Sequence, residues 1–129
     1  MKERINEILG FPAELKKEVF NLSNEQLNTT YRENGWTVRQ VIHHCSDSHI
    51  NCLIRIKWAL TEATPIIKSY DENIWATLQD SFTMPIEPTL NLLQGLHYRM
   101  AYLMQNLSED DLEKKSYILT IIKNTLLKK

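Results

Sequence analysis

The chain has 129 residues, of which 43% are hydrophobic, and its formal net charge at pH 7 is −1. This length and hydrophobic content fit one domain, residues 1–129, with a single core. The near-zero charge argues against binding to nucleic acid or to an anionic membrane surface. Only three glycines and four prolines occur, and no run of β-branched residues alternates strictly with polar ones, so we expect an all-α protein.

The sequence shows no targeting or membrane-spanning segment. The N-terminal residues lack the long apolar stretch of a signal peptide, and no later stretch is long and apolar enough to cross a bilayer. Cys45 and Cys52 are seven residues apart on one predicted helix. Helical rise separates them by about 10.5 Å, which is too far for a disulfide. We therefore expect a cytoplasmic protein whose cysteines are reduced core residues. The alternative is that one of them is a catalytic cysteine.

In chain order, the first expected element covers residues 1–22. Its apolar residues recur at roughly helical spacing, but Gly10 and Pro12 interrupt them, which predicts one bent helix or two short ones. Ser23 and Gln26 then form a capping-box signature, which predicts a short helical turn. The polar residues that follow are expected to form a loop.

The longest expected element is a helix over residues 38–62. Thr37 and Gln40 have the spacing of a capping box at its start. Pro65 limits its end, because the residue before a proline avoids helical dihedral angles. On its outer side a second apolar strip predicts that the helix is covered twice, by its own bundle and by a partner subunit. The strip consists of Ile50, Ile54 and Trp58.

Beyond this helix, Asp71 is expected to cap a short helix. Residues 81–88 contain two prolines and are expected to be loop, with Pro88 at the first position of a second long amphipathic helix. A further turn is expected at residues 109–112. The tail, residues 114–129, is rich in Ile, Leu and Lys, and its loose helical period predicts no definite packing.

Three of the four histidines, His43, His44 and His49, fall within seven positions that also contain Asp47. They point in different directions on a helix, although either His43 or His44 is close enough to share a metal with Asp47. His49 and the fourth histidine, His97, lie on apolar stripes and are expected to be hydrogen-bonded core residues. His43 faces outward and is expected to be solvated. His44 stands at a stripe edge, where it is either structural or lines an inter-helix cavity of the kind in which bundles bind metals.

Four motifs in this chain occur together. The first and most specific is Gly35-Trp36-Thr37-Val38-Arg39-Gln40-Val41-Ile42-His43-His44-x-x-Asp47-Ser48-His49. The supporting motifs are Arg55-Ile56-Lys57-x-Ala59-Leu60-Thr61-Glu62, Pro65-x-Ile67-Lys68-x-Tyr70-Asp71-Glu72-x-x-Trp75 and Leu92-Leu93-x-x-Leu96-His97-x-Arg99. With these motifs the chain resembles the YfiT-like metal-dependent hydrolases of the DinB superfamily, over roughly residues 10–115.

The resemblance implies a DinB-like up-down four-helix bundle, usually a homodimer, that holds a divalent metal such as zinc or nickel through three histidines. By the motif match, His44 corresponds to the first ligand. In the family the other two come from a His-x-x-x-His pair on the last helix, and this chain has no histidine after His97. Since the resemblance fades after Tyr117, we expect a member that is shortened or altered at its C-terminus, and the presence of the last ligand-bearing helix stays open.

Three functional hypotheses follow from this resemblance. The first is a metal-dependent hydrolase of a small-molecule substrate, with His44 as ligand and Asp47 as a candidate base or ligand-orienting group. Transfer of low-molecular-weight thiols, as in other members of the superfamily, is a related alternative. The second is a catalytically inactive, metal-free helical domain for dimerisation or interaction. The third is a marginally stable chain, because each core side chain exposed by a missing helix would cost about 1.5–3 kcal/mol.

Overall fold

The computed structural model describes residues 1–30 and 32–126, without the side chains of residues 109, 112 and 113, and its regular elements are helices. Four of them are long: α1 (Lys2–Val19), α3 (Val38–Thr61), α6 (Glu87–Gln105) and α7 (Leu112–Thr125). The connections contain the short elements α2 (Asn24–Leu27), α4 (Glu72–Trp75), α5 (Gln79–Phe82) and the 3-10 turn η1 (Glu109–Asp111). The expected all-α class is confirmed.

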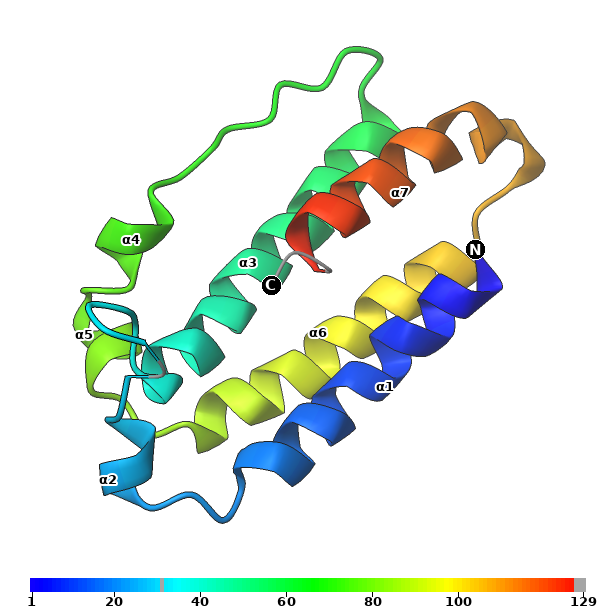
Figure 1. The fold of residues 1–129 in the computed structure, drawn as a ribbon. Coiled ribbons are helices and arrows are strands. Elements are labelled where there is room, and N and C mark those ends of the chain that lie inside the picture. Colours follow the sequence, from blue (N-terminus) through cyan, green and yellow to red (C-terminus); the bar gives the residue numbers. More distant parts are fainter. Residues whose placement is uncertain (31, 127–129) are drawn as a thin grey trace.

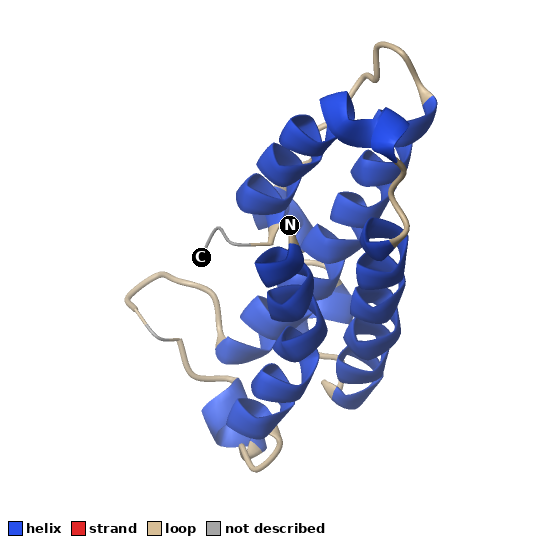
Figure 2. Cartoon of the chain, turned by 90° about the vertical axis from the view of Figure 1, so that its right-hand side faces the viewer, coloured by secondary structure: helices blue, strands red, loops and turns tan. Residues whose placement is uncertain are grey.

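The long helices pack in two pairs. α1 lies along α6, α7 lies along α3, and contacts between α3 and α6 join the pairs into a bundle. Figure 1 shows the bundle with α2, α4 and α5 gathered near the N-terminal end of α3, and Figure 2 shows it after a quarter turn. An extended segment, residues 62–71, runs outside α3 from its C-terminal end to α4 (Figure 1). The N-terminal half of α3, which carries the paired histidines, is therefore surrounded by connecting segments.

The start of α3 has the predicted capping box. Thr37 Oγ1 accepts a hydrogen bond from the Gln40 backbone N–H at 3.1 Å, and Gln40 Oε1 accepts one from the Thr37 N–H at 2.8 Å. Gln40 Nε2 also donates to the Ala76 carbonyl at 2.9 Å, which fastens the segment after α4 to α3. The second predicted capping box, at α2, is present as well. Both helix starts are thus explained by short sequence signatures.

Pro12 lies inside α1, where the sequence predicted a bend or break, and α1 nevertheless forms one helix of 18 residues. Proline has no backbone N–H, so the Ile8 carbonyl, four residues earlier, lacks its usual helical donor. His97 Nδ1 of α6 donates to this carbonyl instead, at 2.7 Å. A tertiary hydrogen bond therefore replaces the missing helical one.

The prediction of a loop over residues 81–88 is wrong in part. α5 extends through Phe82, and α6 already starts at Glu87. Pro88 is the second residue of α6, where its missing N–H costs nothing because the N–H groups of the first helical turn have no partner within the helix. The predicted cap of α4 is confirmed, since the Asp71 carboxylate accepts a hydrogen bond from the backbone N–H at position 74, at 3.1 Å.

α7 covers the core face that the marginal-stability hypothesis expected to be exposed. Four apolar side chains from α7 and its C-cap are buried: Ile118, Ile121, Ile122 and Leu126. α7 thus covers part of the core face, and the marginal stability of the chain stays a prediction. The tail helix contains no histidine, so it is not the ligand-bearing helix that the family resemblance implies.

The apolar core has two parts. The larger lies between the four long helices, and the smaller closes the bundle near α2, where it consists of Val19, Leu27, Ile42 and Ile86. Among the described residues, none of the helices combines the length and the hydropathy that a bilayer span requires.

Candidate functional site

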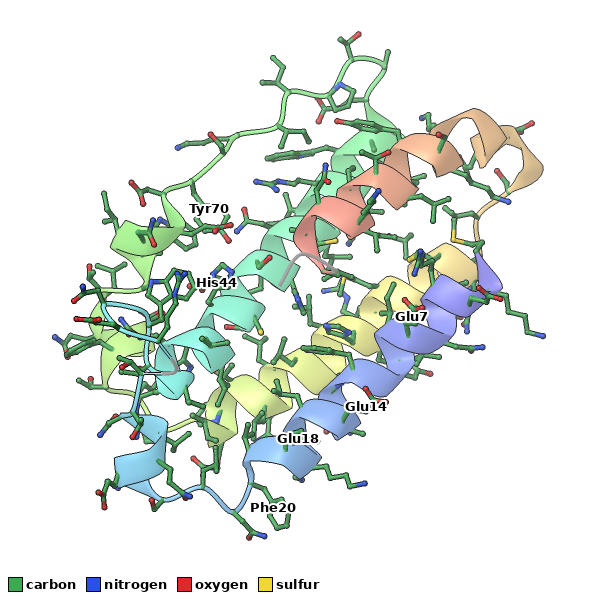
Figure 3. All side chains as sticks on the ribbon, in the orientation of Figure 1. Glu7, Glu14, Glu18, Phe20, His44 and Tyr70 are labelled. Atoms are coloured by element: carbon green, nitrogen blue, oxygen red, sulfur yellow. The ribbon has the colours of Figure 1, made fainter. Side chains whose placement is uncertain are left out.

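The four histidines occupy three separate environments. His44 is partly exposed on the wall of a cleft. Figure 3 shows the His44 side chain on the N-terminal half of α3. His43 is buried at the α5–α6 connection, and His49 and His97 are buried together in the core. The sequence-based expectation that the histidines point apart is confirmed.

The cleft at His44 has a volume of about 580 Å³, which is within the range of small-molecule sites. It lies between α1, the N-terminal half of α3, α4 and the end of α7. Its apolar wall is formed by Phe11, Leu15, Trp36, Val38 and Val41, and its polar wall includes His44, Ser48 and Glu72. We call this space the His44 cleft.

Packing and burial keep the His44 ring ordered and neutral. Its centroid lies 4.8 Å from that of the Trp36 ring, with the planes at 57°. Burial lowers the pKa of His44, and the nearby Glu72 carboxylate offsets this only in part. The imidazole is therefore mainly neutral at pH 7 and keeps a lone pair that can bind a metal ion.

His43 is not solvated, contrary to the prediction from helical phase. It is 2% exposed, because Met84 and the start of α6 cover it. A carbonyl can only accept, so His43 Nε2 donates to the Met84 carbonyl at 2.9 Å. In the neutral ring, Nδ1 then accepts a hydrogen bond from the Thr89 hydroxyl at 2.7 Å. With both nitrogens used, His43 is not available to share a metal with Asp47.

His49 and His97 form a buried pair, as their positions on apolar stripes predicted. They are 3% and 2% exposed, and His49 Nδ1 lies 2.6 Å from His97 Nε2. Since His97 Nδ1 donates to the Ile8 carbonyl, the neutral His97 ring accepts from His49 through Nε2. Burial lowers the pKa of His97, which favours this neutral form. Phe11 stacks on His97 with the ring centroids 5.0 Å apart.

Asp47 does not line the His44 cleft. Burial, and to a smaller extent the charge of Asp80 in α5, raise the pKa of Asp47 to about 6. No hydrogen bond or ion pair connects its carboxylate to His43 or His44, all of which are described. A metal shared by Asp47 and His44 stays a prediction.

Tyr70 of the extended segment reaches toward the side of α3 that carries His44 (Figure 3). Its ring packs on Trp75 with the centroids 4.3 Å apart. Its hydroxyl is buried near Ser48 without a partner in good hydrogen-bond geometry. Burial raises the pKa of Tyr70, and the charges of Glu72 and Asp47 raise it further, so the hydroxyl is protonated at neutral pH.

A catalytic zinc site normally has three protein ligands and an open position for water or substrate. Among the described residues, no group of three His, Cys, Asp or Glu side chains is placed to hold a metal ion. His44 and Glu72 line the same cleft. The described residues thus offer one imidazole with one neighbouring carboxylate and do not form a complete catalytic metal site.

Sequence reasoning did not place Glu72 or Trp36 beside His44. The segment before α4 is extended and lacks hydrophobic periodicity, so its only local signal was the Asp71 cap, which fixes a helix start but not its position against α3. Trp36 could have been found from its place just before the capping box, because a residue there packs on the fourth helical position, Val41, and His44 follows three residues later on the same face.

The sequence matches known proteins over most of its length. A family model described as the DinB superfamily matches residues 11–119. A protein from Oceanobacillus iheyensis, named "Putative metal-dependent hydrolase", is 53% identical over 114 residues, which cover 88% of this chain and 66% of that protein. A Bacillus cereus protein with the same description is 50% identical over 110 residues, covering 85% and 63%.

Among solved structures, YfiT from Bacillus subtilis matches with a TM-score of 0.82 and 46% sequence identity, over 84% of this chain and 62% of YfiT. YfiT is described as a probable metal-dependent hydrolase with an unusual four-helix bundle topology. The chain therefore spans 62–66% of the length of these three proteins. The expected fold class and the resemblance to YfiT-like proteins are confirmed.

Proposed function

Because the chain belongs to the DinB superfamily, we propose that it acts in metal-dependent hydrolysis, with His44 as one ligand of a divalent metal ion. The observation that carries this proposal is a neutral imidazole on the wall of a largely apolar cleft of about 580 Å³. Neutral imidazole is the form that binds metals. The name of the Oceanobacillus relative and the description of YfiT support the same class of activity.

The metal needs ligands besides His44. Since the described residues contain no set of three candidate ligands, the proposal requires further ligands from outside them. The Glu72 carboxylate lies close enough to offset part of the lowering of the His44 pKa by burial. This position suits a carboxylate that orients the imidazole. Zinc and nickel, the ions implied by the family, both accept imidazole ligands.

The described residues of the cleft have roles that do not depend on the missing ligands. A bound divalent ion would supply a Lewis acid for a substrate carbonyl. Trp36 limits the rotation of the His44 ring, and the apolar wall excludes water and binds the apolar part of a small substrate. A pKa of about 6 suits Asp47 as a general base near neutral pH, but its position outside the cleft leaves that role a prediction.

Metal content tests this proposal. The full chain is incubated with Zn²⁺ or Ni²⁺, dialysed, and analysed by mass spectrometry for bound metal. We expect stoichiometric metal in the wild type and none in His44→Ala, with unchanged circular dichroism because His44 is only partly buried. Asn51→Ala, a partly buried position on the same helix but outside the cleft, is the matched control and should retain its metal. A wild type that retains no more metal than His44→Ala contradicts the proposal.

A second candidate, a metal-free dimerisation domain, is favoured by the outer side of α3. Ile54 and Trp58 are 40% and 36% exposed there, while Ile50 packs against the core. Neighbouring exposed apolar side chains suit burial against a second copy. Size-exclusion chromatography with light scattering should give a dimer that Trp58→Glu dissociates and the control Tyr102→Glu leaves intact. A monomeric wild type would exclude this candidate.

A further inference from the structure

A second cleft lies at the end of the bundle where α1, α2 and the α5–α6 connection meet the start of α3. Its volume is about 620 Å³, and none of the described residues lines both it and the His44 cleft. Its wall includes Arg39 and two aromatic side chains, Phe20 and Phe82. We call this space the Arg39 cleft.

Arg39 is a buried cation without an opposite charge in contact. It is 5% exposed, and the acceptors of its three hydrogen bonds are all neutral. Nε donates to Asn28 Oδ1 at 3.1 Å, Nη1 to the Met84 carbonyl at 2.9 Å and Nη2 to Asn24 Oδ1 at 3.2 Å. The guanidinium forms no ion pair with any described residue. Buried charges are normally paired, so this one favours an anion from outside the chain.

The hydrogen bonds of Arg39 leave donors for a ligand. A guanidinium has five N–H groups, and the three bonds leave one N–H on each terminal nitrogen. The Met84 carbonyl also accepts from His43 Nε2, so both of its lone pairs are used and Arg39 is held in place. Two donors on the terminal nitrogens of one arginine suit the two oxygens of a carboxylate.

The remaining wall of the Arg39 cleft favours an apolar group next to that carboxylate. Phe20 and Phe82 line it and are 61% and 50% exposed, so large aromatic surfaces face solvent at its mouth. Val19 and Ile86 add apolar surface. Glu87 is the acidic residue among the described lining residues, and it is exposed, so water and salt screen its repulsion of an anion.

We propose that the Arg39 cleft is a binding site for a small organic carboxylate that carries an aromatic or branched apolar group. The carboxylate takes the two remaining N–H groups of Arg39, and the apolar group packs against Phe20 and Phe82. This site is separate from the His44 cleft, and it stands whether or not the chain binds a metal.

Calorimetric titration of the full chain tests the site with three probes: phenylpropionate, phenylpropionamide and inorganic phosphate. We expect saturable binding of phenylpropionate. The amide should bind roughly tenfold or more weakly, because it lacks the charge that strengthens the hydrogen bonds to Arg39. Phosphate should also bind more weakly, because it has no apolar group.

Variants at the mouth of the cleft separate binding from folding. Arg39→Gln removes the cation but also loosens bonds that hold α2 and Met84, so it can fail to fold. Phe20→Ala and Phe82→Ala change exposed side chains; each should weaken phenylpropionate binding several-fold and leave the melting temperature unchanged. Tyr98→Ala, an exposed aromatic residue of α6 outside the cleft, is the control. The proposal is overturned if no probe binds, if the amide or phosphate binds as tightly as the acid, or if both phenylalanine variants keep the wild-type affinity.

Discussion

Pro12 and His97 should be energetically coupled, although they lie in different helices. His97→Leu removes the hydrogen bonds that His97 makes with two buried groups, the Ile8 carbonyl and His49 Nδ1. Each such group costs about 1–3 kcal/mol, so we expect a loss of roughly 3–4 kcal/mol in the free energy of unfolding. In a Pro12→Ala background, the N–H of residue 12 can bond to the Ile8 carbonyl within α1. In that background His97→Leu should cost only the lost hydrogen bond to His49, which makes its effect on the free energy of unfolding about 1–2 kcal/mol smaller than in the wild type.

A double-mutant cycle measures this coupling. Urea unfolding of the wild type, the two single variants and the double variant is followed by circular dichroism at slightly alkaline pH, where the histidines are neutral. We expect a coupling energy of about 1–2 kcal/mol between Pro12 and His97. Pro85→Ala in the exposed connection before α6 is the matched control and should combine additively with His97→Leu. Additive effects for Pro12 and His97 would refute the idea that His97 replaces the helical donor.

Three further predictions concern α3. Folding raises the pKa of Asp47 from 3.8 to about 6, so the folded chain binds this proton more tightly than the unfolded chain, and wild-type stability falls as the pH rises through this range. Asp47→Asn should therefore have a higher urea midpoint than the wild type above pH 6, and this difference should vanish below pH 3.8. Burial raises the pKa of Cys52 to about 11, so iodoacetamide at mildly alkaline pH should modify Cys52 in the unfolded but not the folded chain, as peptide mass spectrometry would show. Thr37→Ala should cost about 1 kcal/mol in urea unfolding, and Gln40→Ala should cost more because it also breaks a buried hydrogen bond.

Local signals in the sequence were enough to predict the helix starts. A capping box uses residues three positions apart, so Thr37 with Gln40 and Ser23 with Gln26 could be identified without tertiary information. The type of each long helix was equally accessible, because apolar residues recur at the helical period. The hydrogen bond that allows Pro12 inside α1 could not be predicted, since the donor to the Ile8 carbonyl is 89 residues away in sequence.

The error at His43 has a related cause. Helical phase gives the direction of a side chain relative to its own helix, and it placed His43 away from the main apolar stripe. It does not tell what covers that side. The α5–α6 connection brings the Met84 carbonyl and the Thr89 hydroxyl over His43, and these polar partners allow a polar ring to be buried. An outward-facing position on one helix is therefore not the same as a solvated position in the bundle.

The same distinction explains how far the metal site could be inferred. Helix α3 alone places His44 and Ser48 one turn apart, and the structure confirms that both line one cleft. A catalytic metal site is a property of several segments, because its ligands must converge within little more than 2 Å of one point. Here α4 brings Glu72 to the cleft, and the end of α7 brings no histidine. Retention of metal by the full chain, and its loss in His44→Ala, would therefore mean that further ligands reach His44 from outside the described residues. Failure to retain metal would leave the cleft as an apolar binding site with a neutral histidine.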